Sequence, residues 1–159
     1  MTTRHRLLVA VTAVAIAISL SACADIDVVT GTYETLAEAQ QAGAIERGWM
    51  PRGLPSGAHG IREAHDLDRH RLWGLFDFNP GDTDALKATL RPDEISASGL
   101  VCDMPGRVEW WPSLLRGSLD PEPVKSAGLK IYSARDGALI VAVNWGQRRA
   151  YYWTGRNAE

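Results

Sequence analysis

Three short runs rich in apolar residues near the C-terminus constrain the fold more than any other part of the chain. In the runs 129–133 and 139–145 the side chains that share one face recur at every second position, the period of a strand, and 150–153 returns as the third run. Asp136-Gly137 and Gly146-Gln147 separate the runs, and such glycine-containing pairs are typical of tight turns between antiparallel strands. Residues 128–153 are therefore predicted to form a three-stranded antiparallel meander.

The region before this meander predicts a mixture of strands and helices. Alternation over 61–68 and 72–78 indicates two strands joined as a hairpin. Capping patterns at Thr35 and Asp82 predict helices over 36–42 and 83–90. A strand over 99–102 and a short helix over 111–117 are also expected, whereas 120–123 is predicted to be a loop. Together these elements predict an α+β fold: one antiparallel sheet of about five or six strands, with two or three helices on one face.

The first 22 residues differ from the rest and have the form of a secretory signal. Arg4 and Arg6 lie in a short basic head, and residues 7–20 follow without a charge. Fourteen residues of helix reach roughly 21 Å, which is short of the hydrocarbon core of about 30 Å. This length favours a cleaved signal over a permanent transmembrane helix.

The sequence Leu20-Ser21-Ala22-Cys23 resembles the lipobox of bacterial lipoproteins over all four positions. The resemblance implies cleavage before Cys23 and attachment of a diacylglycerol group to its thiol. Two or more acyl chains hold a protein firmly on a membrane, so this group would anchor the chain. The expected organisation is a signal peptide over 1–22, a lipidated tether over 23–29 and a single domain over 30–159. Ala24 stands where many inner-membrane lipoproteins have Asp, so we expect an outer-membrane location facing the periplasm if the source has an outer membrane.

Charge and cysteine content restrict the expected partners. Cleavage removes Arg4 and Arg6 but no acidic residue, so the formal net charge changes from −2 to −4. A mildly acidic domain gives no electrostatic reason to bind nucleic acid. With Cys23 lipidated, Cys102 has no second cysteine in the chain, and we expect it to be a buried, unreactive thiol.

The most distinctive part of the mature sequence extends from Glu46 to Phe76. It resembles the YbbD head domain, a family of small bacterial lipoproteins, in its Glu-Arg-Gly-Trp, Leu-Pro and Ile-x-Glu-x-His-Asp-Leu-Asp motifs. The resemblance implies an envelope location and brings no catalytic residues. The residues of this chain that carry the pattern are Glu46, Arg47, Gly48, Trp49, Leu54, Pro55, Ile61, Glu63, His65, Asp66, Leu67, Asp68 and Trp73.

Two functional hypotheses follow from the polar residues of this segment. The first is a non-catalytic module that binds an envelope protein and needs no cofactor or resident metal, with candidate binding residues Glu63, His65, Asp66, Asp68, Trp49 and Trp73. The second is a small metal-dependent or acid–base hydrolase that uses His65, Asp66 and Asp68, since imidazole and carboxylates bind metals and exchange protons. On a flat strand Glu63 and His65 point away from Asp66 and Asp68, and no H-E-x-x-H motif or phosphate-binding loop is present. The first hypothesis is therefore preferred, with Asp66 and Asp68 stabilising a turn.

The aromatic residues provide a second candidate for partner binding. We expect Trp49, Trp73, Phe76 and Trp145 in the core. The pair Trp110-Trp111 and the run 151–153 are harder to bury completely, and exposed aromatic side chains are common in binding surfaces.

Overall fold

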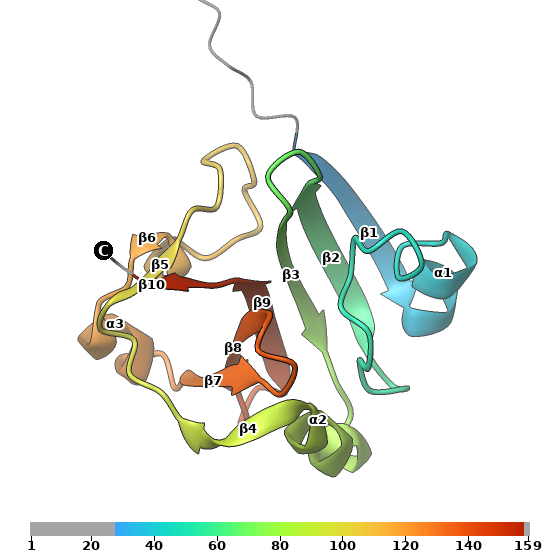
Figure 1. Cartoon of the computed structure of the whole chain (residues 1–159). Coiled ribbons are helices and arrows are strands. Elements are labelled where there is room, and N and C mark those ends of the chain that lie inside the picture. Colours follow the sequence, from blue (N-terminus) through green and yellow to red (C-terminus); the bar gives the residue numbers. More distant parts are fainter. Residues whose placement is uncertain (1–27, 158–159) are drawn as a thin grey trace, which may run out of the picture.

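The computed structural model describes residues 28–157, which form one α+β domain (Figure 1). Cleavage before Cys23 and lipidation of this residue concern positions outside the described residues. The helices are α1 (Leu36–Gln41), α2 (Thr83–Thr89) and α3 (Pro121–Ser126), with 3₁₀ turns at η1 (Pro80–Asp82) and η2 (Ser113–Leu115). The strands are β1 (Val29–Thr35), β2 (His59–Asp66), β3 (Arg71–Asp77), β4 (Leu90–Glu94), β5 (Leu100–Cys102), β6 (Gly117–Ser118), β7 (Lys130–Ala134), β8 (Leu139–Asn144), β9 (Arg149–Thr154) and β10 (Arg156–Asn157).

Seven strands form the main sheet in the order β1-β2-β3-β9-β8-β7-β4, and every pairing is antiparallel. The predicted meander is confirmed as β7-β8-β9, and the predicted hairpin as β2-β3. A smaller sheet pairs β5 with β6 and with β10. The main sheet is larger than the predicted five or six strands because β4 extends its edge. Residues 90–94 do not alternate in hydrophobicity and contain Pro92, so they gave no strand signal.

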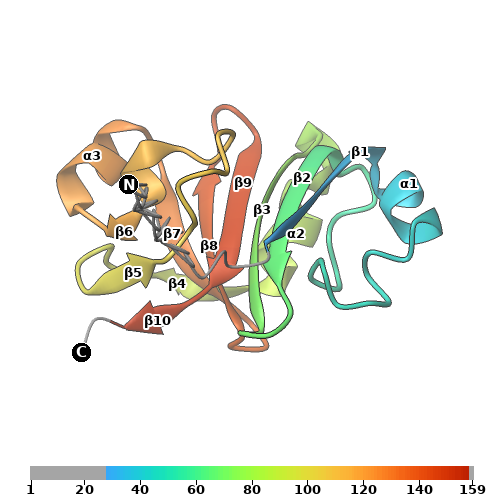
Figure 2. The same cartoon turned by 90° about the horizontal axis from the view of Figure 1, so that it is seen from above.

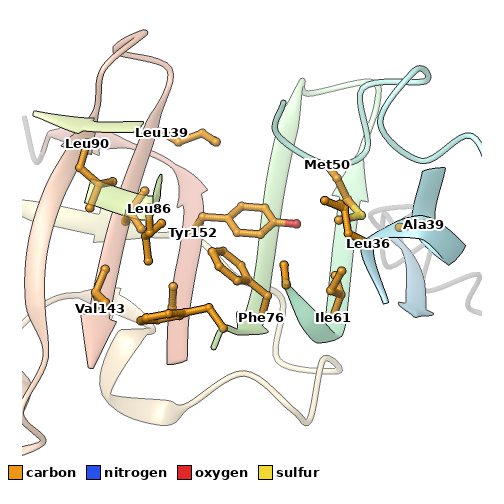
Figure 3. Close-up of a cluster of buried hydrophobic side chains, with 14 of the residues drawn as sticks. Leu36, Ala39, Met50, Ile61, Phe76, Leu86, Leu90, Leu139, Val143 and Tyr152 are labelled. Atoms are coloured by element: carbon orange, nitrogen blue, oxygen red, sulfur yellow. The ribbon is translucent and has the colours of Figure 1, made fainter. Parts of the chain in front are cut away.

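Both faces of the main sheet are covered, each by its own hydrophobic cluster. The first cluster includes side chains from α1, α2 and the segment 44–58, and Figure 3 shows Tyr152 and Phe76 at its centre. The second includes side chains from the segment 95–127, which contains α3. Figures 1 and 2 show α1 near β1 at one side of the domain and α3 with the small sheet at the other. Two helices, α1 and α2, therefore cover one face, as the sequence predicted, whereas α3 packs on the other.

Helix α3 occupies a segment that was predicted to be a loop. The Asp120 side chain accepts a hydrogen bond from the backbone N–H of Glu122 at 3.1 Å, as an N-cap residue does. Pro121 and Pro123 lie in the first turn, where backbone N–H groups have no partner within the helix. The two prolines therefore cost this helix no internal hydrogen bond.

Most of the aromatic residues suspected of exposure are buried. Trp111, Tyr152 and Trp153 belong to the core, while Trp110 and Tyr151 are partly buried. Trp111, within the segment 95–127, packs edge-on against Trp153 of β9. Arg116 holds this segment in place by donating to the carbonyl oxygens of Met104 at 3.3 Å and Pro105 at 2.7 Å. A partner-binding role for these aromatic rings is not supported by their burial.

Candidate functional site

A row of residues across four neighbouring strands creates the setting of the candidate site. The register places Gly31 opposite Glu63, Glu63 opposite Gly74, and Gly74 opposite Tyr152. A Cβ atom on Gly31 would lie 2.5 Å from the Glu63 carboxylate, and one on Gly74 would collide with the Tyr152 ring. The two glycines thus leave the space that a carboxylate and a phenol ring occupy on this face of the sheet.

Glu63 and His65 form a buried hydrogen-bonded pair on β2. The Nδ1 atom of His65 lies 2.8 Å from Oε2 of Glu63, and their side chains are 2% and 1% exposed, respectively. Because residues two apart on a strand point to the same face, the backbone alone brings the two groups together. Burial raises the pKa of the Glu63 carboxyl above its ordinary value, and the hydrogen bond with His65 opposes part of this rise.

Trp49 covers this pair from the segment between α1 and β2. Its ring stacks on the His65 imidazole with centroids 4.6 Å apart and planes 10° from parallel. The guanidinium carbon of Arg47 lies 4.7 Å from the centroid of the Trp49 ring, a distance typical of a cation–π contact. Trp49, with Arg47 over its ring, therefore covers the imidazole, and we call this cover the Trp49 lid.

Two tyrosines lie near the Glu63 carboxylate. Burial raises the pKa of both Tyr33 and Tyr152, and the negative charge of Glu63 adds to the effect. The Tyr152 hydroxyl is buried and has no hydrogen-bond partner within residues 28–157. Figure 3 shows its ring reaching across the cluster toward Met50 and Ile61. The site is thus a set of polar side chains surrounded by an apolar core.

Asp66 and Asp68 do not join this group. The Asp66 side chain is buried on the other face of the sheet, where its Oδ1 accepts the backbone N–H of Arg69 at 3.0 Å. Asp68 is exposed in the turn that follows β2. Trp73 packs in the second cluster, on the face away from Trp49. Among the described residues, no three His, Cys, Asp or Glu side chains are arranged to hold a metal ion.

The sequence indicated only part of this arrangement. Glu63, His65 and Trp49 were expected to be functional candidates, and Tyr152 was considered only as part of the aromatic run 151–153, whereas Gly31, Tyr33 and Gly74 were not expected. Glycine inside a strand signals a close approach of another group, and this signal was present at Gly31 and Gly74. It could not indicate which residue approaches, because Tyr152 comes from a strand far along the chain.

The comparison with protein families matches residues 27–77 to the YbbD head domain. This segment is about a third of the chain and contains β1, α1, the Trp49 lid, β2 and β3. No curated protein and no solved structure matches the chain. In the described part of the chain, none of the helices is both long and apolar enough to cross a membrane. Residues 27–77 therefore resemble the YbbD head domain, and they contain the whole Glu63–His65 pair with its lid.

Proposed function

We propose that this protein is a lipid-anchored, non-catalytic accessory module of the bacterial cell envelope. The single observation that carries the proposal is the burial of Glu63 and His65 beneath Trp49. Two groups that could perform acid–base chemistry are enclosed and hydrogen-bonded to each other, so neither is open to a substrate. The resemblance of this segment to the YbbD head domain agrees with an envelope accessory role.

The alternative hydrolase would need His65, Asp66 and Asp68 to face a common substrate. Their positions do not favour this function, because the first two lie on opposite faces of the sheet and the third lies in an exposed turn. A hydrolytic role would require β2 to change its backbone conformation so that His65 and Asp66 face the same side. The accessory function requires no such rearrangement.

The anchor in this proposal is the lipid on Cys23, and the membrane is the outer one wherever the source has two. Ala24 after the lipidated cysteine supports this location. The partner would be an envelope protein that reaches the domain from the periplasm. Cross-linking in intact membranes, followed by purification of the full chain, would identify this partner.

Fractionation of cells that express the full chain tests the anchor. Cys23→Ser should lose incorporation of a labelled fatty acid and leave the membrane fraction, because serine does not form the thioether. Cys102→Ala is the matched control, since it removes the other cysteine and should keep both the label and the membrane location. Membrane retention of Cys23→Ser equal to that of the unaltered chain would overturn the lipid anchor.

A further inference from the structure

A hollow of about 520 Å³ lies between α2, β4 and β7, outside the site described above. Its lining contains basic and aromatic side chains and no acidic one. This composition contrasts with the net negative charge of the whole chain. The basic and aromatic residues of the lining are Lys87, Arg91, Lys130, Arg135, Tyr132 and Trp145.

The hollow coincides with an irregular pairing of β4 with β7. Leu90 lies opposite Ala134 and Glu94 opposite Tyr132, so β4 has two more residues than β7 over this interval. Pro92, in the middle of the interval, has no N–H to donate to β7. The bulged strand diverges from β7 there, and bulges of this kind are common beside binding sites.

The basic side chains are available for a ligand to different degrees. Lys130 is paired with Glu94 at 3.3 Å, and Nε of Arg135 donates to the carbonyl oxygen of Ala88 at 2.9 Å. Lys87 lies 5.6 Å from the centroid of the Trp145 ring. Arg91 is exposed and makes no ion pair within the described residues. Arg91 and Lys87 are therefore the cations best placed to bind an anion.

Two rings provide a firm wall for the rest of a ligand. The indole N–H of Trp145 donates to the Tyr132 hydroxyl at 3.2 Å, and the two rings meet edge-on with centroids 6.2 Å apart. Phe78 supports Trp145 from the core. Apolar ring surface beside basic groups is suited to a small anion with a compact organic body.

We infer that this hollow binds a sugar that carries a phosphate or carboxylate group. The anion would contact Lys87 and Arg91, and the sugar ring would pack against Trp145 and Tyr132. Two of the elements that line the hollow, α2 and β4, lie at the end of the domain away from the start of β1 (Figure 1). The binding itself does not depend on the anchor.

Calorimetric titration of the purified full chain in a neutral detergent tests this inference. Glucose 6-phosphate should bind saturably, whereas glucose should not bind and inorganic phosphate should bind more weakly. Arg91→Glu and Lys87→Glu should each weaken binding by about tenfold or more, since each reverses a charge at the anion. Lys125→Glu, on the exposed side of α3, is the matched control and should bind like the unaltered chain.

Three results would overturn the inference. The first is binding that is unchanged in both Arg91→Glu and Lys87→Glu, with unchanged melting temperatures as proof of folding. The second is inorganic phosphate binding as tightly as glucose 6-phosphate, which would leave no role for the sugar ring. The third is binding to phosphatidylglycerol vesicles without binding to glucose 6-phosphate, which would identify a lipid headgroup as the ligand.

Discussion

The Tyr152 ring occupies the space above Gly74 that any side chain at that position would need. Gly74→Ala should therefore force the ring or the strand to move, at a cost of about 1–3 kcal/mol in the free energy of unfolding. Gly81→Ala is the control, because a Cβ there meets no atom within 4 Å. Denaturant unfolding measures both. Equal stabilities of the two variants would show that Tyr152 does not constrain Gly74.

The buried Glu63 carboxyl predicts a dependence of stability on pH. Its pKa is raised by burial above the ordinary value of 4.5, so the folded state holds this proton more tightly than the unfolded state does. The resulting contribution to stability is complete below pH 4.5 and is lost as the pH rises through the folded-state pKa. Ionisation of the buried carboxyl therefore costs stability at any pH above the folded-state pKa.

Glu63→Gln should remove this contribution, because an amide does not titrate and still accepts a hydrogen bond from His65. We expect the variant to be more stable than the unaltered chain at neutral pH, with the difference shrinking as the pH falls toward 4.5. Thermal unfolding over a pH series measures the difference. Parallel pH profiles for the two proteins would contradict the assignment of this titration to Glu63.

At the scale of elements, the turn between β2 and β3 depends on one of its two aspartates. Asp66→Ala removes the acceptor of the Arg69 N–H, and the expected cost is about 1 kcal/mol or more. Asp68→Ala should change stability little, because Asp68 is exposed and accepts no hydrogen bond within the described residues. Melting temperatures of the two variants test this difference. A larger loss for Asp68→Ala would show that the turn is held in another way.

Elements with a local signal were predictable from sequence. The meander β7-β8-β9 consists of short apolar runs with glycine-containing turns between them, and α1 has a capping pattern at Thr35 whose hydroxyl accepts the Glu38 N–H at 3.2 Å. Strand β4 has no such signal, since its pairing with β7 comes from the tertiary fold. Helix α3 was missed because its two prolines suggested a loop, although Asp120 caps it.

The candidate site was predictable only where it is local. Glu63 and His65 are two residues apart, so strand geometry alone places them on one face. The lid and the glycine row depend on contacts across the sheet. Trp49 reaches His65 from an irregular segment, and Tyr152 meets Gly74 because β3 pairs with β9. No local pattern encodes such pairings between distant segments.

In the whole molecule, residues 95–127 form a layer over one face of the main sheet. The burial of Cys102 within this layer determines the reactivity of its thiol. The thiol is fully buried in the second cluster, and burial raises its pKa to about 12. A buried and protonated thiol is a poor nucleophile, so a polar thiol reagent should label Cys102 only after denaturant is added. The absorbance of the thiolate that the reagent releases measures how much of Cys102 has reacted. Rapid labelling of the native chain would mean that the layer opens.

His65 lies in the interior of the segment 27–77, beneath Trp49 and beside Glu63. Removing its imidazole would leave a cavity beneath Trp49 and take away the hydrogen-bond partner of the Glu63 carboxyl. The matched control is His59→Ala, because His59 lies on the same strand and is exposed.

The most direct measurement is the free energy of unfolding of His65→Ala beside that of His59→Ala. We expect a loss of about 2–4 kcal/mol for His65→Ala and little change for His59→Ala. A His65→Ala protein as stable as the unaltered chain would show that His65 has no structural role, because the imidazole would then be dispensable to the fold and available for a ligand or a reaction.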